Sequence, residues 1–322
     1  MKFLILKTHS PYLNLAIEEY FFEHTTDDVF MLWQNEPTVV IGKNQNAYAE
    51  INMNYVAEKG INVSRRITGG GAVYHDFGNV NYTFISTKEN NGIDFAYFTK
   101  PIIEALDSLG IVATLSGRND LLIGEKKFSG NAQFTRGKRV LHHGTLLFDS
   151  DLDVLTSALN VDEEKIKSKA IKSARSRVAN LKDYIPSAVS VNDFIDIIAK
   201  FTIDKYSPEI IDAPNNDIID ALTLRNSSSE WIYPKKEYLS SYSLVKKKRY
   251  PFGTVEMYID MSNDVVKKIS ILGDFFGISD ISELEALLIE TKISDVQEKL
   301  SRINVEDYIL GMTNEIFLEH IK

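Results

Sequence analysis

The segment from Arg65 to Asp76, RRITGGGAVYHD, constrains the fold of this chain more than any other. It places three consecutive glycines between a predicted strand over residues 61–66 and another over residues 80–86. Glycine has no Cβ, so it adopts positive φ angles at low steric cost and lets a ligand approach the backbone closely. A loop of such residues can turn several N–H groups towards one anion. The sequence therefore predicts an anion-binding loop between two strands.

Polar side chains flank the glycines on both sides. Arg65 and Arg66 precede them, and His75 and Asp76 follow. Guanidinium groups are planar cations whose donors suit phosphate or carboxylate oxygens. Taken alone, this pattern is also typical of a glycine-rich turn beside two surface arginines. Other motifs in the chain are needed to distinguish an anion-binding loop from an ordinary glycine-rich turn.

Two familiar phosphate-binding motifs are absent from the sequence. A P-loop has the string GxxxxGK[ST] between a strand and a helix, and no such string occurs here. A dinucleotide-binding fingerprint has GxGxxG, and Tyr74 occupies the place of its last glycine. Any nucleotide must therefore be held in another way.

Length and composition exclude several classes of protein. The chain has 322 residues, which suggests two domains, and its 44% of hydrophobic residues is typical of a globular protein. A net charge of −9 argues against general nucleic-acid binding, which needs a basic face. No apolar run reaches the roughly 18 residues of a membrane helix. Residues 1–7 read as a strand rather than a signal peptide. We therefore expect a cytoplasmic protein without membrane association.

The chain contains no cysteine. Disulfides, zinc–thiolate sites and iron–sulfur clusters are therefore excluded. Mechanisms in which a cysteine carries an acyl group as a thioester are excluded as well.

Hydrophobic periodicity predicts a mixed α and β fold. Helical spacing predicts helices over residues 14–22, 52–59, 102–109, 281–289 and 296–303, the first of which carries Glu18 and Glu19. Alternation and β-branched residues predict strands over residues 29–33, 38–41, 61–66, 80–86, 121–128, 140–148, 253–260 and 265–272. Pro101 fits the first turn of the third helix, where its missing N–H costs little.

A second polar cluster, SGRND, covers residues 116–120. Asn119 and Asp120 offer hard oxygen ligands of the kind that Mg²⁺ takes, usually one or two carboxylates together with substrate phosphates. The alternative is an Asn-Asp turn before the strand that starts at Leu121.

Two pairs of adjacent side chains follow this cluster. Successive residues of a strand point to opposite faces. One of Lys126 and Lys127 can therefore reach a buried ligand while the other is solvated. The same alternation predicts that one of His142 and His143 points inwards and the other outwards. The histidines and carboxylates have no spacing that predicts a zinc site.

Several motifs in a fixed order resemble one family. They are GKNQN at 42–46, RRITGGGAVYHD at 65–76, GNVNYTF at 78–84, SGRND at 116–120, KFSGNA at 127–132, HHGTLLF at 142–148 and KSARSRVANL at 172–181. This series resembles the lipoate–protein ligases of the A type, and the resemblance covers nearly the whole chain. It implies an α+β fold, with a large mixed-sheet catalytic domain of the biotin/lipoate ligase type over residues 1–244. A small α/β C-terminal accessory domain over residues 245–322 is expected to follow it, with a hinge around residues 242–249.

The resemblance also implies a reaction. Lipoate and ATP, with Mg²⁺, give lipoyl-adenylate and pyrophosphate, and a lysine of an acceptor lipoyl domain then attacks the mixed anhydride. Lys127 matches the central catalytic lysine of the family, and Asp120 is the expected Mg²⁺ ligand. Because a carboxylate and a triphosphate must be brought together, positioning and charge neutralisation should dominate the first step.

The remaining site residues follow from the same resemblance. The expected ATP and lipoyl-AMP site comprises Arg66, Gly69, Gly70, Gly71, Ala72, Val73, Tyr74, His75, Asn79, Asn119, Asp120 and Lys127. The expected lipoate site comprises Trp33, Arg66, Lys127, His143, Gly144 and Thr145. Trp33 is equally compatible with an ordinary core aromatic.

The implied partners are lipoyl domains: the glycine cleavage H protein and the acyltransferase subunits of 2-oxo acid dehydrogenases. Octanoyltransferases of the same superfamily use a cysteine thioester, which this chain cannot form. Biotin–protein ligases usually carry a GRGRxG-like loop, which is absent. A paralogue that binds lipoyl-adenylate or lipoyl domains without turnover is the alternative to an enzyme. We expect a monomer, because two domains can bury an adequate core alone.

Overall fold

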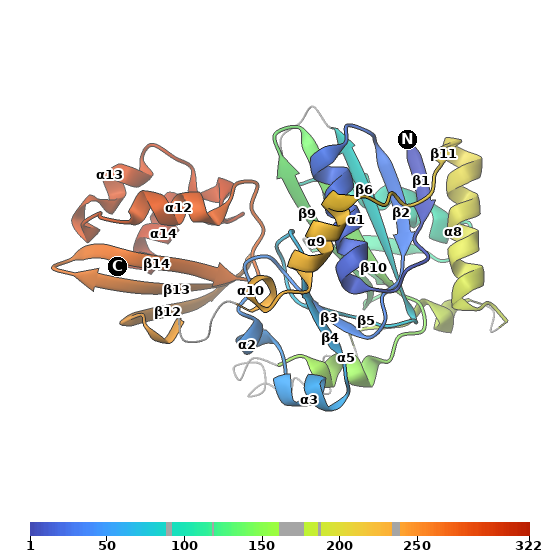
Figure 1. The fold of residues 1–322 in the computed structure, drawn as a ribbon, viewed down its shortest axis with the longest axis horizontal. Coiled ribbons are helices and arrows are strands. Elements are labelled where there is room, and N and C mark those ends of the chain that lie inside the picture. The colour runs from blue at the N-terminus through green and yellow to red at the C-terminus, as the bar shows by residue number, and fades with distance from the viewer. Residues whose placement is uncertain (88–91, 118, 161–176, 186–187, 234–238) are drawn as a thin grey trace.

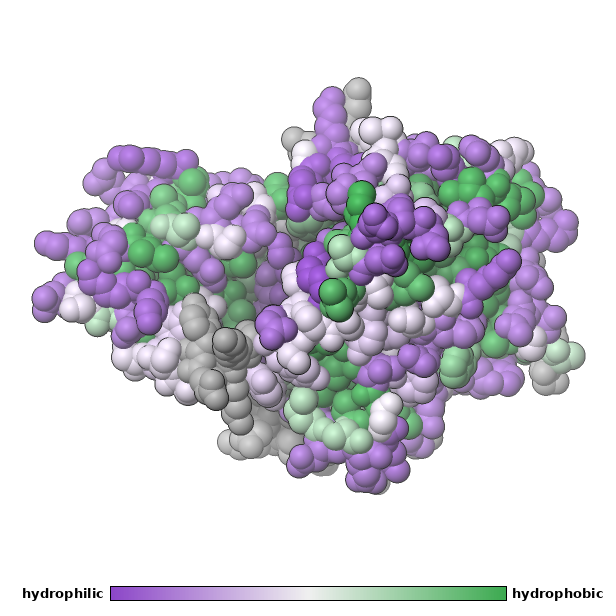
Figure 2. Space-filling model, viewed as in Figure 1, coloured by the Kyte–Doolittle hydropathy of each residue, from purple (hydrophilic) through white to green (hydrophobic). Residues whose placement is uncertain are grey.

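The computed structural model describes residues 1–87, 92–117, 119–160, 177–185, 188–233 and 239–322. It consists of two lobes joined side by side (Figure 1). We call residues 1–233 the large lobe and residues 244–322 the small lobe. Polar side chains cover most of the face of both lobes that Figure 2 shows. Among the described residues, no helix has the length and hydropathy that a membrane span requires.

A mixed sheet of eight strands forms the centre of the large lobe. In spatial order its strands are β11 (Glu209–Ile210), β1 (Lys2–Ile5), β2 (Val29–Trp33), β6 (Asn79–Thr87), β10 (Arg139–Leu147), β9 (Lys126–Arg136), β8 (Asp120–Ile123) and β7 (Ala113–Ser116). β11, β1 and β2 run parallel to one another, whereas every pair from β2 to β7 is antiparallel. The central strands bury both faces, which explains their nearly continuous apolar runs.

Helices cover the two faces of this sheet. α4 (Phe95–Asp107) and α8 (Val191–Tyr206) pack on one face, where Ile102, Leu106 and Phe194 join the largest core cluster. α1 (Pro11–His24) and α9 (Asp217–Asn226) contribute to a second core on the other side. α1 begins at Ser10, whose hydroxyl accepts a hydrogen bond from the N–H of Leu13, with proline in the first turn.

A second sheet of three strands lies at the base of the large lobe (Figure 1). Its order is β4 (Asn62–Arg65), β3 (Thr38–Ile41) and β5 (Val73–His75). The glycine run connects β4 to β5 through the loop that the sequence predicts. The remaining short helices of this lobe are α2 (Ala47–Glu50), α3 (Met53–Glu58), α5 (Leu152–Ala158), α10 (Ser229–Ile232) and the 3₁₀ turn η1 (Leu181–Tyr184).

The small lobe has its own sheet and its own hydrophobic core. Its antiparallel strands are β12 (Leu244–Tyr250), β13 (Gly253–Ser262) and β14 (Val265–Gly273). The helical segments are α12 (Ile281–Leu288), η2 (Ile293–Asp295), α13 (Val296–Leu300), η3 (Val305–Asp307) and α14 (Asn314–Ile321). The predicted fold class, a large mixed-sheet domain with a small α/β C-terminal domain, is confirmed.

The small lobe contacts the glycine loop of the large lobe. The N–H of Gly70 donates to the carbonyl of Phe275 at 3.1 Å. Phe276 is fully buried in a small cluster with Phe95 and Ala132 of the large lobe. Lys43 Nζ forms an ion pair with Asp280 Oδ2 at 2.6 Å. The loop that the sequence predicts to bind an anion therefore lies at the junction of the lobes.

The structure corrects two local predictions. α4 begins at Phe95 because Asp94 caps it by accepting from the N–H of Tyr97, so Pro101 lies inside the helix and not in its first turn. The strand predicted over residues 121–128 is two strands, separated at Gly124, whose φ of 58° is left-handed. The basic run at residues 246–249 belongs to edge strand β12.

Candidate functional site

One row of residues crosses five neighbouring strands of the large sheet. Trp33 on β2 pairs with Asn81 on β6, and Asn81 pairs with Thr145 on β10. The hydroxyl of Thr145 accepts from the N–H of Gly130 on β9 at 3.1 Å, and Gly130 pairs with Asp120 on β8. Four strand spacings separate the ends of this row, which is about 19 Å. The row joins an aromatic end at Trp33 to a charged end at Asp120.

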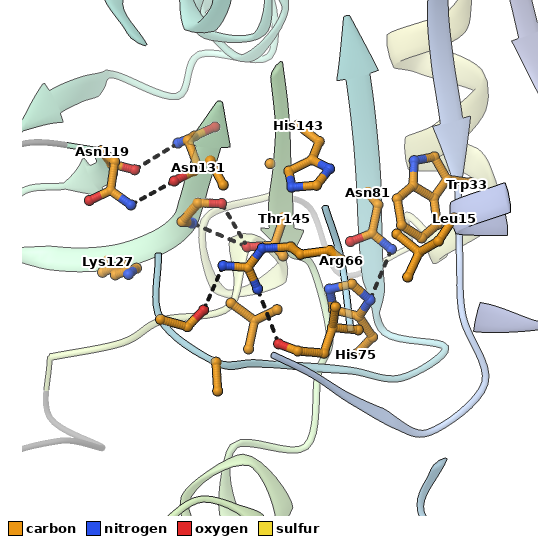
Figure 3. Close-up of a pocket in the computed structure, with 17 residues that line it drawn as sticks. Leu15, Trp33, Arg66, His75, Asn81, Asn119, Lys127, Asn131, His143 and Thr145 are labelled. Carbon is orange, nitrogen blue, oxygen red and sulfur yellow. Dashed lines mark hydrogen bonds between the residues drawn. The ribbon is translucent and has the colours of Figure 1, made fainter. Parts of the chain in front are cut away.

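A cavity lies along this row (Figure 3). It encloses about 100 Å³, several times the roughly 10–15 Å³ that one water molecule needs. Its walls are mostly apolar with a few polar groups, as in typical small-molecule sites. The lining residues are Leu15, Trp33, Val40, Arg66, Gly71, Ala72, Val73, His75, Asn81, Asn119, Lys127, Gly130, Asn131, Ala132, His143, Gly144 and Thr145.

The structure gathers most of the predicted site residues around this one cavity. Gly69, Gly70, Tyr74, Asn79 and Asp120 are not among its lining residues, although Asp120 pairs with the lining residue Lys127. Sequence reasoning missed Leu15, Val40, Asn81, Gly130, Asn131 and Ala132, which line it as well. Gly130, Asn131 and Ala132 stand inside a motif that carried the resemblance, whereas Leu15 and Val40 carried no signal beyond burial. Of the motif residues, Arg118 and residues 172–176 lie outside the described residues.

Arg66 holds the glycine loop in place. Its Nη2 donates to the carbonyls of Gly69 and Gly71 at 2.7 and 2.8 Å, and its Nη1 donates to Val40 O at 3.1 Å. Its Nε donates to Thr68 Oγ1 at 2.9 Å. Burial lowers the pKa of this guanidinium to about 10, so it stays cationic at neutral pH. A fixed positive charge therefore lies in the wall of the cavity.

The glycines of the loop differ in what surrounds them. A Cβ on Gly70, whose φ is 88°, would lie 2.8 Å from the ring of Phe276. A Cβ on Gly69 would lie 2.4 Å from Phe275 O. A Cβ on Gly71 would meet no atom within 4 Å of the protein. A side chain at position 69 or 70 would therefore collide with the small lobe. Gly71, in contrast, leaves open space in the cavity wall that a ligand can fill.

Lys127 and Asp120 form an ion pair at the charged end of the cavity. Lys127 Nζ lies 2.7 Å from Asp120 Oδ1, and both side chains are a little over one-third exposed. Lys126 is exposed, so the predicted division of the two lysines is confirmed. Among the described residues, no group of three His, Cys, Asp or Glu side chains could hold a metal. Asp120 alone fits an Mg²⁺ ion only if phosphate oxygens supply other ligands.

A directed chain of hydrogen bonds runs behind the cavity wall. Arg66 Nε donates to Thr68 Oγ1, and the Thr68 hydroxyl reaches His143 Nε2 at 2.9 Å. His143 Nδ1 lies 2.8 Å from Glu18 Oε1. Because an ionised carboxylate only accepts, the Nδ1 of His143 carries the proton and its Nε2 accepts from Thr68. The chain therefore ends at the Glu18 carboxylate, which is 1% exposed.

Glu18 also receives a second branch of this chain. Trp33 Nε1 donates to Thr83 Oγ1 at 2.9 Å, and the Thr83 hydroxyl donates to Glu18 Oε1 at 2.7 Å. Trp33 is thus fixed at the cavity end by a hydrogen bond as well as by packing. Sequence reasoning missed the role of Glu18. The signal was present, because a carboxylate occupies an otherwise apolar stretch of a predicted helix.

Three predicted side chains lie elsewhere than expected. Tyr74 packs in the core of the β4–β3–β5 sheet, because strand alternation turns it away from the cavity. Asn79 Nδ2 donates to Asn81 Oδ1 at 2.9 Å and so acts behind the cavity. His142 does not point outwards to solvent: it is fully buried against Phe98 of α4, because helices cover this face of the sheet.

Asn119 and Asn131 tie the β7–β8 turn to β9. Asn119 Nδ2 donates to Asn131 O at 2.6 Å, and Asn131 Nδ2 donates to Asn119 O at 3.0 Å (Figure 3). The Tyr82 hydroxyl donates to Asn131 Oδ1 from behind. A Cβ on Gly144 would lie 2.2 Å from that same oxygen, so the glycine makes room for Asn131. These bonds fix the turn that presents Asp120 to Lys127.

Comparison with known proteins identifies the family of the chain. Residues 10–202 match the family model described as the lipoyl protein ligase A/B catalytic domain, and residues 240–321 match the bacterial lipoate protein ligase C-terminus. The chain belongs to the lipoate–protein ligase family.

Proteins named as lipoate–protein ligases resemble the chain over almost its full length. Lipoate-protein ligase LplJ of Bacillus subtilis is 38% identical, with 97% of each chain covered. Lipoate–protein ligase 1 of Staphylococcus aureus is 37% identical, with 92% of each covered. The predicted family and its class of enzyme, a ligase, are confirmed.

Solved structures of such ligases share the fold. LipL1 of P. falciparum in complex with lipoate has a TM-score of 0.81 at 25% identity, covering 100% of this chain and 98% of that one. A lipoate-protein ligase A bound with ATP has a TM-score of 0.62 at 26% identity, covering 71% of this chain and 97% of that one.

Proposed function

We propose that this chain is an ATP-dependent lipoate–protein ligase that activates lipoate, or octanoate, as lipoyl-AMP and releases pyrophosphate. It then transfers the acyl group to a lysine of lipoyl domains in the glycine cleavage H protein and in 2-oxo acid dehydrogenase acyltransferase subunits. One observation carries the proposal: a single cavity runs from an aromatic end at Trp33 to a charged end at Lys127. Such a cavity suits an acid with an apolar tail and a carboxylate head.

Lys127 is the proposed catalytic residue. Its ammonium lies at the charged end, where the carboxylate and the α-phosphate of ATP would meet, and it can neutralise the charge that develops during both transfers. The open backbone at Gly71 and the cation of Arg66 provide room and charge for the nucleotide. Preorganised groups of this kind lower a barrier without reorganising at the moment of reaction.

Asp120 would hold a magnesium ion that arrives with the triphosphate. The ion would neutralise phosphate charge when it is bound. In its absence, Asp120 pairs with Lys127 at 2.7 Å. Lys127 must break this ion pair to reach a substrate. The ion pair therefore holds the ammonium group beside the position where it would act.

The boundary between the catalytic and accessory domains is proposed at residue 244. β12 begins there and pairs only within the small lobe, as far as the described residues show. We further propose that the protein acts as a monomer, since each lobe has its own core.

Pyrophosphate release with ATP and Mg²⁺ tests the first step. We expect release with lipoate and with octanoate but not with biotin, followed by the mass increase of one acyl group on an acceptor lipoyl domain. Lys127→Ala should lower the rate by roughly 10²–10³-fold or more, as the loss of one preorganised donor does elsewhere. Lys126→Ala, at the exposed neighbour, should leave the rate unchanged.

The alternative is a paralogue that binds without turnover. It would bind lipoate and ATP, as isothermal titration can show, and yet release no pyrophosphate even with acceptor present. Wild-type activity in Lys127→Ala would remove the catalytic assignment.

A further inference from the structure

The two histidines in the cavity wall are held in opposite tautomers. His143 accepts from Thr68 at Nε2, so its proton is on Nδ1 and bonds Glu18. His75 is 3% exposed and lies edge-on to Trp33, with ring centroids 5.9 Å apart. The tautomer of His75 is set by neighbouring amide groups rather than by a carboxylate. The orientation of these amides follows from their hydrogen bonds, which begin at a backbone carbonyl.

The backbone carbonyl of Gln34 fixes the orientation of the first amide. It can only accept, and it lies 2.8 Å from Asn14 Nδ2, so the amide group of Asn14 is oriented. The same Asn14 Nδ2 donates to Asn35 Oδ1 at 2.9 Å. The remaining amide nitrogen of Asn35 therefore faces His75, where it donates to Nδ1 at 3.0 Å.

A second amide supports the same tautomer. Asn81 Nδ2 lies 3.5 Å from His75 Nδ1, and Asn79 Nδ2 donates to Asn81 Oδ1, which turns the Asn81 nitrogen towards the ring. Two donors meet at Nδ1, so this atom carries the lone pair. The proton of the neutral imidazole is then on Nε2. Burial lowers the pKa of His75 to about 3, so the ring is neutral at physiological pH.

The Nε2–H of His75 has no acceptor among the residues that the structure describes. Figure 3 shows this nitrogen on the side of the ring that faces the cavity, away from Asn81. His75 neighbours Trp33 and Asn81, so it lies at the aromatic end of the cavity. A buried donor without an acceptor is costly, so an atom of the ligand is expected to accept from it.

We infer that His75 is a specificity-determining residue whose Nε2–H donates to a sulfur of the dithiolane ring of lipoate. The inference rests on the proposed function and refines it. At the aromatic end, the tail of a straight-chain acid offers carbon alone, whereas a disulfide sulfur is a weak acceptor. An acid without sulfur would exclude water from the donor and leave it unpaired, so the site favours a dithiolane-bearing acid. Asn35 and Asn14 are positioning residues, because they act through the tautomer of His75.

A pair of isosteric substrates tests this inference. 5-Cyclopentylpentanoate has the shape of lipoate but carries CH₂ groups in place of both sulfurs. In pyrophosphate release, we expect wild-type kcat/KM to favour lipoate by about tenfold, the scale of a buried donor that loses its acceptor. His75→Phe should bring this ratio close to one, mainly through a higher KM for lipoate.

His142→Phe is the matched control. This variant also removes a buried imidazole whose nitrogens have no hydrogen-bond partner among the described residues, but His142 packs on Phe98 and does not line the cavity. Its lipoate preference should equal that of the wild type. If His75→Phe lowers activity with both acids by the same factor, or if the wild type shows no preference, His75 does not recognise the sulfur of lipoate.

A spectroscopic measurement decides the question even if His75→Phe does not fold. Ring ¹⁵N shifts of the wild-type protein should show the Nε2–H tautomer, and lipoate should move the Nε2 signal while the cyclopentyl analogue does not. A proton on Nδ1 would overturn the inference. If the wild type releases no pyrophosphate with any acid, the proposed function fails, yet the ¹⁵N response to lipoate still tests His75.

Discussion

Adjacent residues of identical type carry out different tasks in this molecule. Arg65 and Arg66 stand side by side in the sequence, and strand alternation at the end of β4 sends them in opposite directions. Arg66 lines the cavity, whereas Arg65 donates to the carbonyls of Gly42, Lys43, Gln45, Trp231 and Ile232. The sequence indicates two arginines beside a glycine loop, but it does not distinguish the ligand-facing cation from the structural one.

Arg65→Lys should destabilise the protein by about 2–3 kcal/mol. The ammonium keeps the charge but cannot reach all five carbonyls, so buried acceptors lose their donors. Chemical denaturation monitored by fluorescence measures the difference. Arg136→Lys, at an exposed ion pair with Glu23, is the control and should stay within about 0.5 kcal/mol of wild type. Equal effects of the two changes would contradict the structural role of Arg65.

Glu18 and Glu19 form a second such pair on α1. Glu18 ends the hydrogen-bond chain behind the cavity, whereas Glu19 forms a bidentate ion pair with Arg225 on α9. Glu18 also supplies the negative charge that favours the cationic form of Arg66 against burial. The first carboxylate therefore concerns the site, and the second concerns helix packing.

Glu18→Gln should raise KM for lipoate by about tenfold, with a smaller change in kcat. The amide keeps the shape and an oxygen that can accept from His143 and Thr83, but it removes the negative charge that favours the cationic form of Arg66. Steady-state pyrophosphate release at varied lipoate concentrations measures the split. Glu19→Gln is the control: it should lower stability and leave KM at its wild-type value. A Glu18→Gln variant with unchanged KM would show that the chain does not position Arg66.

At the scale of elements, the loop between β4 and β5 is shaped by two neighbours. A Cβ on Gly42 would lie 2.1 Å from Gly70 O, so the segment after β3 packs directly on the glycine run. Gly69 and Gly70 are in contact with the small lobe. Gly71 faces the cavity and is restricted by no protein atom.

Gly71→Ala should therefore separate binding from stability. We expect the melting temperature to stay near that of wild type, because the methyl group meets open space. Binding of ATP, measured by calorimetry, should weaken at least several-fold because the methyl group occupies the path of the ligand. Gly42→Ala should do the reverse and lower stability by about 1–3 kcal/mol. Unchanged ATP affinity in Gly71→Ala would mean that the nucleotide lies elsewhere.

At the scale of the whole molecule, the two lobes meet over the site. The carbonyl of Phe275 accepts a hydrogen bond from the N–H of Gly70, and Phe276 packs between α4 and β9. The lobes are also joined by Lys43 and Asp280. Burial raises the pKa of Asp280, but hydrogen bonds from Lys43 and Ser282 outweigh it and lower the pKa from 3.8 to about 2.

The Asp280 ion pair should give the stability of the molecule an acid-dependent part. Because its folded-state pKa is lowered, this part is fully present above pH 3.8 and is lost as the pH falls towards 2. Asp280→Asn should cost less than about 1 kcal/mol at pH 6, since the carboxylate is partly exposed. Denaturation of both proteins at pH 6 and pH 2 should show this difference shrinking with acid. A difference that persists at pH 2 would contradict the ionic contribution.

The sequence by itself determined the family, the mixed fold and most residues around the cavity. The glycine run, KFSGNA and HHGT are local patterns, and each placed a functional side chain on a strand or loop whose type could be predicted. Alternation along β9 also predicted correctly that Lys126 and Lys127 differ: Lys127 lines the cavity, whereas Lys126 is exposed to solvent. Local rules suffice here because strand geometry is set by near neighbours.

Only the tertiary structure decided which of these groups act together. Arg66 is linked to Glu18 through Thr68 and His143, and the tautomer of His75 depends on Asn14 and Gln34. Glu18, Asn14 and Gln34 come from an earlier helix and from the end of β2, so the spacing of residues in the sequence does not predict the contacts. His142 illustrates the same limit, because α4 buries a residue that alternation alone would expose. Hydrogen-bond direction and burial are properties of packed neighbours, and the fold brings those neighbours together from distant parts of the chain.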